Sequence, residues 1–335
     1  MKLLSPFGTL YGRIMDLRNL LYDHEILKSY SLGARTISVG NLTTGGTGKT
    51  PLVGLIAGIL AESGEKVCIL TRGYGRENPK KRVLVSDGEN LLVDASAGGD
   101  EPVELASKLN GKAIIVADAD RVAAAKWARE NFDISAFILD DGFQHRRAKR
   151  GLDIVCIDAT SPCGNGRLLP AGTLRESFRA LSRADAIVIT RANLVNDVGE
   201  IEKRLRNRNT SAPIFRASTK IESFVPLEGV SRKQVPSRLF AFCGIGNPDS
   251  FFAALKSAGF EPVGSKAFPD HHRFTQTDVL ELEKRAVLDS AEALVTTAKD
   301  AVKLERLKFS LPCYVALAET VIDDPEAFRE VLFSS

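Results

Sequence analysis

The sequence predicts an α/β fold in which a parallel sheet with helices on both faces is followed by a smaller α/β lobe. Short apolar runs rich in β-branched residues alternate with helical patterns up to residue 191. A second block of the same alternation begins near residue 238. Such alternation builds parallel strands joined by helices that cover the sheet. Ligands of these sheets bind at the carboxyl ends of the strands, so functional side chains are expected there.

The first block, residues 1–206, forms one predicted domain. Its predicted strands are residues 35–40, 66–71, 113–118, 136–141, 152–158 and 186–191. Helical patterns occupy the connections, most clearly at residues 51–62 and 121–131.

Residues 207–237 differ from the blocks on either side. Short extended pieces at 213–218 and 222–227 are separated by charges, and no long helical pattern is present. We therefore expect a linker with a small strand pair. The smaller lobe follows over 238–335. Its predicted strands are 239–245, 262–268, 293–298 and 313–317, and its predicted helices are 250–258 and 277–286.

Composition limits the class of protein. The chain has 335 residues, of which 44% are hydrophobic and 26% are charged, as in ordinary globular domains. The formal net charge is only +3. A dedicated nucleic-acid binder normally has a strongly basic face, so no nucleic-acid partner is expected.

Cysteine usage indicates a reducing compartment. The cysteines are five in number, widely spaced and without a CxxC pair: Cys68, Cys156, Cys163, Cys243 and Cys313. This pattern favours free thiols in a cytosolic protein over a disulfide framework or a zinc site. Three of them lie inside apolar runs, where a buried hydrophobic role is expected.

The N-terminal segment has a helical apolar stripe. Apolar residues recur at helical spacing from Phe7 to Leu21, with Arg13, Arg18 and Lys28 nearby. No stretch reaches the length of about 18 uncharged apolar residues that a spanning helix needs. Two interpretations stay open on this pattern alone: a helix packed on its own domain, or one that lies on a membrane surface.

A glycine-rich turn follows the first predicted strand. Its residues at the start of the next helix are Gly45, Gly46, Thr47, Gly48, Lys49 and Thr50. Backbone N–H groups of such a turn surround phosphate oxygens, the lysine reaches the terminal phosphates, and the threonine hydroxyl ligates magnesium. Thr43 occupies the position of the first glycine of the strict pattern. The alternative is a tight connection without a ligand, but the whole combination predicts a domain similar to P-loop NTPases.

Two adjacent aspartates, Asp140 and Asp141, end the predicted strand 136–141. Carboxylates side by side repel, so their joint ionisation is easiest next to a cation. An acidic residue at a strand end is the expected second part of a metal and nucleotide site. The alternative is a polar turn that uses Asp141 and Gly142.

Seven motifs occur in order, within a region of family matches that extends from about Tyr11 to Asp300. They are VGNLTTGGTGKTP, RGYGR, GGDEP, DDGFQHR, LLPAGTLRE, FPDHHRF and TTAKD. In this order they resemble the tetraacyldisaccharide 4'-kinase family, the lipid A 4'-kinases of Gram-negative bacteria. The family departs from the strict phosphate-loop pattern in the same way, which accounts for Thr43.

The resemblance implies an activity and a location. The implied reaction transfers the γ-phosphoryl group of ATP, with Mg²⁺, to the 4'-hydroxyl of tetraacyldisaccharide 1-phosphate. The implied location is peripheral, on the cytoplasmic face of the inner membrane. With this substrate, membrane or acyl-chain contact becomes the preferred interpretation of the N-terminal stripe.

The resemblance also implies residue roles. Lys49 acts on the phosphates, and the metal ligands come from Thr50, Asp140 or Asp141, and Glu176. Asp100 is the general base, and His271 is its partner. Taken alone, Asp100 would be read as a helix cap, and His271 as a loop histidine bonded to Asp270.

Further candidates bind the nucleotide and the acceptor. Arginine's planar fork suits phosphate, so Arg72 and Arg121 are candidates for the substrate's 1-phosphate and Arg175 for the nucleotide phosphates. His145, a potentially cationic group near a predicted strand end, is a further candidate for substrate binding, and Gln144 is a weaker candidate for a polar contact in the cleft expected between the two lobes. Lys299 and Asp300 of TTAKD are candidates for contact with the nucleotide base. The family commonly has proline at the positions of Ala298 and Ser177, which affects loop rigidity and removes no chemical group.

Two rival functions use the same loop. One is a nucleotide-dependent regulatory or assembly NTPase that modifies no small substrate. The other is a soluble small-molecule kinase whose N-terminal helix is purely structural. Phosphorylation of the lipid separates the kinase of the resembled family from both.

Overall fold

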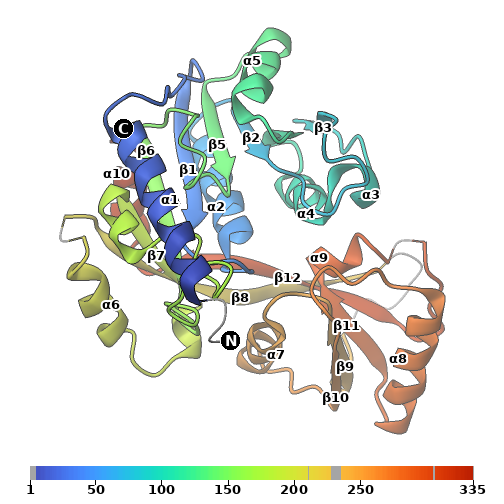
Figure 1. Ribbon diagram of the computed structural model, residues 1–335. Coiled ribbons are helices and arrows are strands. Elements are labelled where there is room, and N and C mark those ends of the chain that lie inside the picture. Colours follow the sequence, from blue (N-terminus) through green and yellow to red (C-terminus); the bar gives the residue numbers. More distant parts are fainter. Residues whose placement is uncertain (1–4, 210, 228–234, 305, 335) are drawn as a thin grey trace.

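The computed structural model describes residues 5–209, 211–227, 235–304 and 306–334 (Figure 1). They form a mixed α/β fold around one large sheet. Its strands are β1 (Arg35–Asn41), β2 (Val67–Thr71), β3 (Val83–Asp87), β4 (Ala113–Ala117), β5 (Ala136–Asp140), β6 (Leu152–Asp158), β7 (Ala186–Thr190), β8 (Ile214–Pro226), β9 (Leu239–Cys243), β10 (Gly264–Ala267), β11 (Ala293–Thr297) and β12 (Cys313–Ile322).

Helices pack on this sheet and connect its strands. They are α1 (Ser5–Asp23), α2 (Lys49–Glu62), α3 (Ala95–Gly98), α4 (Asp100–Leu109), α5 (Arg121–Asn131), α6 (Gly199–Arg206), α7 (Pro248–Ser257), α8 (Gln276–Leu288), α9 (Ala298–Ala301) and α10 (Pro325–Phe333), with 3₁₀ turns η2 (Phe178–Arg183) and η3 (Ala192–Leu194).

The sheet is mostly parallel. The strand order is β10-β9-β11-β12-β8-β7-β6-β1-β5-β2-β4-β3. Among these neighbours, β3 with β4 and β8 with β12 are antiparallel, and the other pairs are parallel. The inner strands β2, β5, β6 and β7 are buried along their whole length, which is why they read as continuous apolar runs.

The protein has two lobes, which are built on different parts of this sheet (Figure 1). We call the part built on β1–β7 the large lobe and the part built on β9–β11 and the first half of β12 the small lobe. The long strands β8 and β12 run from one to the other, and they pair with each other along most of their length. Since β8 also pairs with β7, the two lobes share a continuous sheet.

The predicted linker strands need correction. Residues 213–218 and 222–227 were expected as a pair of short pieces, but residues 214–226 form the single strand β8. Its partners are β7 and β12, which lie outside the predicted linker. Much of β8 is exposed and therefore carries charged residues, and these made the segment look like a linker in the sequence.

The last helix belongs with the large lobe. Phe328 and Leu332 of α10 are fully buried in the same apolar cluster as β1, α2 and β5, and Phe328 packs edge-on against Phe215. The division of the chain at residues 206 and 237 stays a prediction. If it is adopted, residues 325–333 are better counted with the first domain than with the predicted lobe 238–335.

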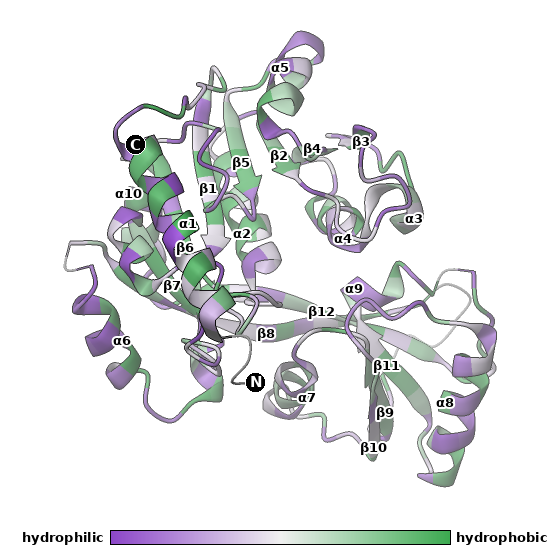
Figure 2. Ribbon diagram, viewed as in Figure 1, coloured by the Kyte–Doolittle hydropathy of each residue, from purple (hydrophilic) through white to green (hydrophobic). Residues whose placement is uncertain are grey.

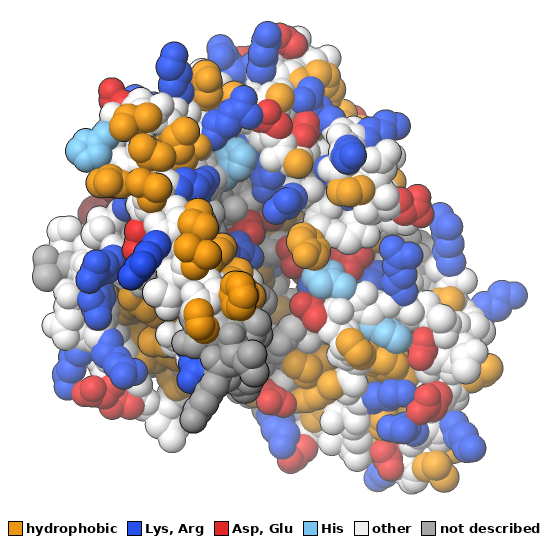
Figure 3. All heavy atoms as spheres, viewed as in Figure 1, with side chains coloured by type: hydrophobic (Ala, Val, Ile, Leu, Met, Phe, Trp, Pro, Cys, Tyr) orange, Lys and Arg blue, Asp and Glu red, His pale blue; other side chains and the backbone are white. Residues whose placement is uncertain are grey.

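Helix α1 turns its apolar stripe outward. The large apolar side chains of α1 that are more than half exposed are Phe7, Leu10, Ile14, Leu17 and Leu20. Hydrophobic residues stand out along α1 in Figure 2, and their side chains gather on the visible face of the molecule in Figure 3. One interpretation of the sequence required this stripe to pack on the domain. The structure shows instead that the stripe faces outward.

The inward face of α1 is made of small and polar residues. Gly8 lies so close to Leu168 and Ala171 that an added Cβ would sit 3.1 Å from the Leu168 carbonyl oxygen. One turn later Gly12 faces the Leu168 side chain, and Asn19 is buried. Glycines allow this close approach, because a larger side chain would push the helix away.

No helix among the described residues is long and apolar enough to cross a bilayer.

Candidate active site

The phosphate loop joins β1 to α2 at the carboxyl end of the sheet. Gly48 has a left-handed φ of 77°, which glycine adopts without steric cost, and Lys49 begins the helix. Thr47 is held on both sides: its hydroxyl accepts from Asn41 at 2.8 Å, and its carbonyl accepts from the Thr190 hydroxyl at 2.8 Å. The loop is thus fixed at the start of α2, where the positive end of the helix lies.

Lys49 and Arg175 converge on Asp141. Lys49 Nζ lies 3.5 Å from Asp141 Oδ1, and Arg175 NH1 donates to both Asp141 oxygens at 2.8 and 2.7 Å. Burial would raise the pKa of Asp141, but the two cations outweigh burial and lower it. Asp141 therefore stays ionised, and the two cations predicted to act on phosphates already share one anion.

Asp140 lies next to this group but is buried. Its Oδ2 accepts from the Thr71 hydroxyl at 2.9 Å, and its Oδ1 has no hydrogen-bond partner among the described residues. Burial, with the nearby charges of Glu101 and Asp141, raises its pKa to about 6. A cation placed beside Asp140 would relieve this cost.

Glu101 ties the loop to the small lobe, and sequence reasoning missed it. Its Oε2 accepts from the Thr50 hydroxyl at 3.3 Å, and its Oε1 lies 3.3 Å from Lys299 Nζ. Lys299 also lies 3.3 Å from Asp270. The prediction from the GGDEP motif assigns a role only to Asp100. The second carboxylate of the motif, Glu101, is the feature of the sequence that points to this further site residue.

The predicted catalytic pair is in contact. His271 Nδ1 lies 3.1 Å from Asp100 Oδ2. Asp100 is the first residue of α4 and not its cap, and His271 lies after β10 with a left-handed φ of 59°. Burial acts to raise the pKa of Asp100, but the bond from His271 and the charge of Lys303 outweigh it and hold this pKa below its ordinary value.

The two TTAKD residues differ in exposure and in contacts. Lys299 faces Glu101 and Asp270, as described above. Asp300 is fully buried: it accepts from the Gly244 N–H at 2.8 Å and the Thr297 hydroxyl at 2.9 Å. It also lies 2.8 Å from Lys303 Nζ. All of these partners belong to the small lobe. Because the Asp300 carboxylate is buried, it is not exposed for the predicted contact with the nucleotide base.

Glu176 has different contacts from those of Asp140 and Asp141. Its Oε2 accepts from Asn19 at 2.6 Å and from Arg183 at 3.0 Å, which joins α1 to the large lobe. Its Oε1 is buried without a hydrogen-bond partner among the described residues. The predicted metal role of Glu176 stays a prediction.

The predicted acceptor-binding residues have different environments. Arg72 is exposed, whereas Arg121 is buried and donates to backbone carbonyls of Asp118 and Ala119 at 2.9 and 3.2 Å. These bonds hold the ends of β4 and α5 together.

The other two candidates for substrate binding, Gln144 and His145, are adjacent in sequence. Gln144 donates to the Asn41 carbonyl at 2.9 Å, and its Oε1 lies 3.4 Å from Arg175 NH1. Burial lowers the pKa of His145 to about 4, and the positive charges of Arg121 and Arg150 add to this. A neutral His145 offers hydrogen bonds to an acceptor rather than a positive charge.

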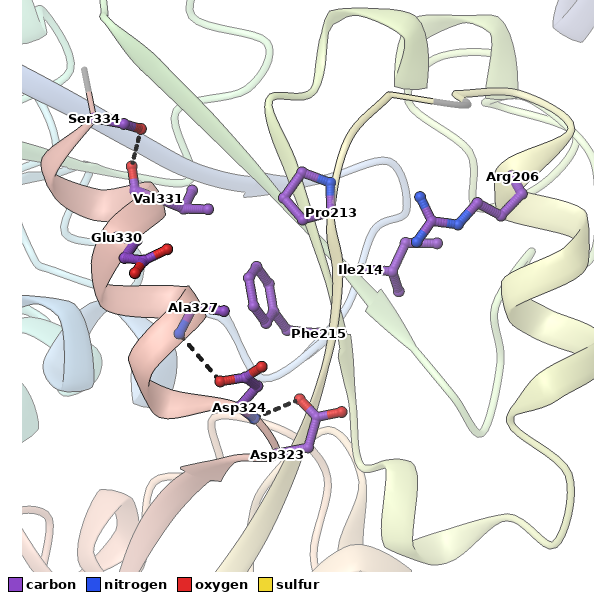
Figure 4. Close-up of a pocket in the computed structure, with 10 residues that line it drawn as sticks. All are labelled: Arg206, Pro213, Ile214, Phe215, Asp323, Asp324, Ala327, Glu330, Val331 and Ser334. Atoms are coloured by element: carbon purple, nitrogen blue, oxygen red, sulfur yellow. Dashed lines mark hydrogen bonds between the residues drawn. The ribbon is translucent and has the colours of Figure 1, made fainter.

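A separate hollow of about 590 Å³ lies on the outside of the large lobe. It lies between the end of α6, β8 and α10, and Figure 4 shows Asp324 capping α10 there. None of its ten lining residues is a predicted site residue.

Metal-binding groups are not preassembled in the part of the chain that the structure describes. There, no three or more His, Cys, Asp and Glu side chains are grouped closely enough to hold a metal ion.

Comparison with known proteins decides the family. The family described as Tetraacyldisaccharide-1-P 4'-kinase matches residues 1–335. The chain belongs to this family. The tetraacyldisaccharide 4'-kinase of Desulfotalea psychrophila is 41% identical, over 95% of this chain and 92% of that protein. That of Geobacter metallireducens is 38% identical, over 98% and 96%.

A solved structure of the family has the same fold. The crystal structure of LpxK from Aquifex aeolicus in complex with ATP superposes with a TM-score of 0.77 at 32% identity. The match covers 99% of this chain and 98% of that one. The family named from the seven motifs is thereby confirmed, and with it tetraacyldisaccharide 4'-kinase activity in lipid A biosynthesis.

Proposed function

We propose that the chain transfers the γ-phosphoryl group of ATP to the 4'-hydroxyl of tetraacyldisaccharide 1-phosphate, with Asp100 as general base. One observation supports the placement of Asp100 next to the nucleotide phosphates. Asp100 is followed by Glu101, which accepts a hydrogen bond from Thr50, the residue after Lys49. The base and the phosphate loop are therefore neighbours in space, as phosphoryl transfer requires.

The large lobe is the proposed nucleotide-binding part. The unit of β1, glycine-rich loop and α2 has the order and helix start of a P-loop NTPase, and the Aquifex aeolicus relative was solved with ATP. Lys49 and Arg175 supply positive charge for the phosphates. Because Asp141 holds both cations in this structure, ATP has to compete with that carboxylate or displace it.

The residues present fit a magnesium ion. Mg²⁺ prefers oxygen ligands and is bound by one or two carboxylates together with substrate phosphates. Asp140 Oδ1 is a buried oxygen without a hydrogen-bond partner among the described residues, and the charges of Glu101 and Asp141 are close enough to raise the pKa of Asp140. Thr50, with Asp140 or Asp141, would hold the ion. Bound there, Mg²⁺ would neutralise charge on the phosphates.

Asp100 prepares the acceptor in this proposal. It takes the proton of the 4'-hydroxyl as the oxygen bonds to phosphorus, while the bond from phosphorus to the β-phosphate oxygen breaks and ADP leaves with that electron pair. His271 orients the carboxylate through Oδ2.

Closure of the lobes is proposed to complete the site. Asp100 and Glu101 belong to the large lobe, whereas their partners His271 and Lys299 belong to the small lobe. If the lobes separate, both contacts break. Opening would admit the lipid, and closing would exclude water and limit wasteful ATP hydrolysis.

The outward stripe of α1 is the proposed contact with the membrane or the acyl chains. Exposed patches of large apolar side chains on a globular protein mark interaction surfaces. The stripe belongs to a helix that is anchored to the large lobe through Gly8, Gly12 and Asn19. We place the enzyme peripherally, on the cytoplasmic face of the inner membrane.

Labelled ATP tests this function directly. The purified chain is incubated with γ-labelled ATP, Mg²⁺ and tetraacyldisaccharide 1-phosphate, and the lipid and inorganic phosphate are counted separately. Label on the lipid at the 4' position supports the proposal. Release of inorganic phosphate alone would favour a regulatory NTPase, and labelling of a soluble acceptor in preference to the lipid would favour a small-molecule kinase.

A further inference from the structure

Lys303 has a largely enclosed side chain, and none of the residue roles described above includes this lysine. Its side chain is only 8% exposed. The small lobe holds it with three contacts: Asp300 Oδ1 at 2.8 Å, the His272 carbonyl at 3.3 Å and the face of the Phe274 ring at 5.5 Å. A buried ammonium is costly to desolvate, so a lysine this enclosed is normally paired.

One further contact crosses to the large lobe. Lys303 Nζ lies 3.6 Å from Asp100 Oδ2, the oxygen that His271 Nδ1 also contacts at 3.1 Å. Asp300 is fully buried and also contacts the ammonium, at 2.8 Å. Lys303 thus contacts two carboxylates, Asp300 of its own lobe and the proposed base Asp100.

We propose that Lys303 is a positioning residue for phosphoryl transfer, which together with His271 fixes Asp100 through Oδ2 and leaves Oδ1 to take the proton of the 4'-hydroxyl. This rests on the proposed role of Asp100 as general base. The ammonium does not touch the reacting atoms. It acts through the carboxylate.

The charge of Lys303 has a second effect on Asp100. Burial works against an ionised carboxylate, and a nearby cation works for it. The other groups around Asp100 are His271, Lys299, Asp270 and the neighbouring Glu101; the two latter anions are engaged by Lys299. After the hydrogen bond from His271, the charge of Lys303 is the next influence that holds the pKa of Asp100 down, and Asp300 offsets part of that charge.

Because Lys303 and His271 are both held by the small lobe, Asp100 acquires its two partners only when the lobes meet. The base is then fully oriented only in the closed enzyme, which is where transfer to the lipid is wanted.

The test compares pH profiles of the full-length enzyme. Lys303→Met removes the charge at similar length. We expect kcat to fall roughly tenfold and the acidic limb of the kcat profile to move up by about one pH unit, with KM for ATP little changed. Lys303→Arg should restore most of the activity and the original limb. Lys308→Met, an exposed lysine of the same lobe, is the matched control and should behave as the parent.

Loss of Lys303 also leaves Asp300 buried without its cation, which can destabilise the lobe. The double variant Lys303→Met/Asp300→Asn removes both charges and should fold. Its pH profile should still be shifted. A folded double variant with the parent's kcat and pH profile overturns the proposal.

The test separates this inference from the proposed function. If Asp100→Asn keeps normal turnover, the base assignment itself fails. If Asp100→Asn is inactive while both Lys303→Met variants behave as the parent, only the role of Lys303 fails.

Discussion

His271 Nδ1 lies 3.1 Å from Asp100 Oδ2, although 171 positions of sequence separate the two residues. One begins helix α4 of the large lobe, and the other lies in a loop of the small lobe. The contact brings a carboxylate and an imidazole together within one residue of Glu101, which bonds the phosphate loop. Catalysis in this family member is therefore expected to depend on how the lobes meet.

Replacing either member of this pair should lower turnover more than binding. For Asp100→Asn and for His271→Ala, we expect kcat to fall by about 10² or more, because general base catalysis contributes about that factor. Binding of ATP, measured by calorimetry, should change little, since neither side chain is in the phosphate loop. Normal turnover in either variant would remove that residue from the mechanism.

Lys49→Ala should weaken nucleotide binding and turnover together. The ammonium at the start of α2 is the expected partner of the terminal phosphates, and alanine leaves Asp141 with Arg175 alone. We expect kcat/KM for ATP to drop by roughly two orders of magnitude, a loss typical of one charge-stabilising group. Lys66→Ala removes an exposed lysine of the same lobe and serves as control. Full activity of Lys49→Ala would contradict our placement of the nucleotide.

Acid should destabilise the fold in part through His145. Burial lowers its pKa to about 4 from an ordinary value of 6.5. Between these values the unfolded chain binds more protons than the folded one, so the free energy of unfolding falls as the pH drops through this range. His145→Gln removes this proton uptake and should flatten the fall.

Urea unfolding near pH 7 and near pH 4.5 measures this difference. His24→Gln, at an exposed position, is the control and should leave the parent's slope. An unchanged slope in His145→Gln would show that the imidazole titrates alike in both states.

Charges placed on the outer face of α1 should weaken membrane binding. Ile14→Glu and Leu17→Glu each replace a side chain that is more than half exposed, so the fold should tolerate them. Because burying such a side chain contributes about 1.5–3 kcal/mol, partitioning to vesicles should fall at least roughly tenfold for each. Flotation with vesicles of anionic phospholipid measures it.

Leu288→Glu, on α8 and 74% exposed, is the matched control for this experiment. It should leave vesicle binding unchanged, because it lies on the small lobe. Equal loss in all three variants would mean that the α1 stripe has no special role, and unchanged binding in the α1 variants would point to a structural or protein-binding helix.

Much of the fold was readable from local pattern. The apolar runs of β1, β2, β5 and β6 and the glycine-rich loop before α2 lie within a few residues of their predicted positions. Side chains that are buried on both faces of a parallel sheet have to be apolar whatever surrounds them, so the pattern predicts the strand. The seven motifs then identified the family, which the relatives confirm.

What the sequence could not decide depends on long-range pairing. Strand β8 looked like a linker because its exposed positions carry charge, and its partner β12 lies about 100 residues later. The direction of the α1 stripe was likewise open, since a helical period shows that one face is apolar but not which face meets the domain.

For the site, the sequence by itself determined the groups available: a loop for phosphate, two aspartates at a strand end, and a carboxylate and an imidazole in separate motifs. Only the tertiary structure decided which of these groups meet. It shows that Lys303 contacts Asp100 and that Glu101 contacts both Thr50 and Lys299. It also shows that the Asp300 carboxylate is buried and bonded within the small lobe. The reason is physical. Local pattern follows from burial of neighbouring residues, whereas contacts between side chains of two lobes follow from how the shared strands β8 and β12 place those lobes.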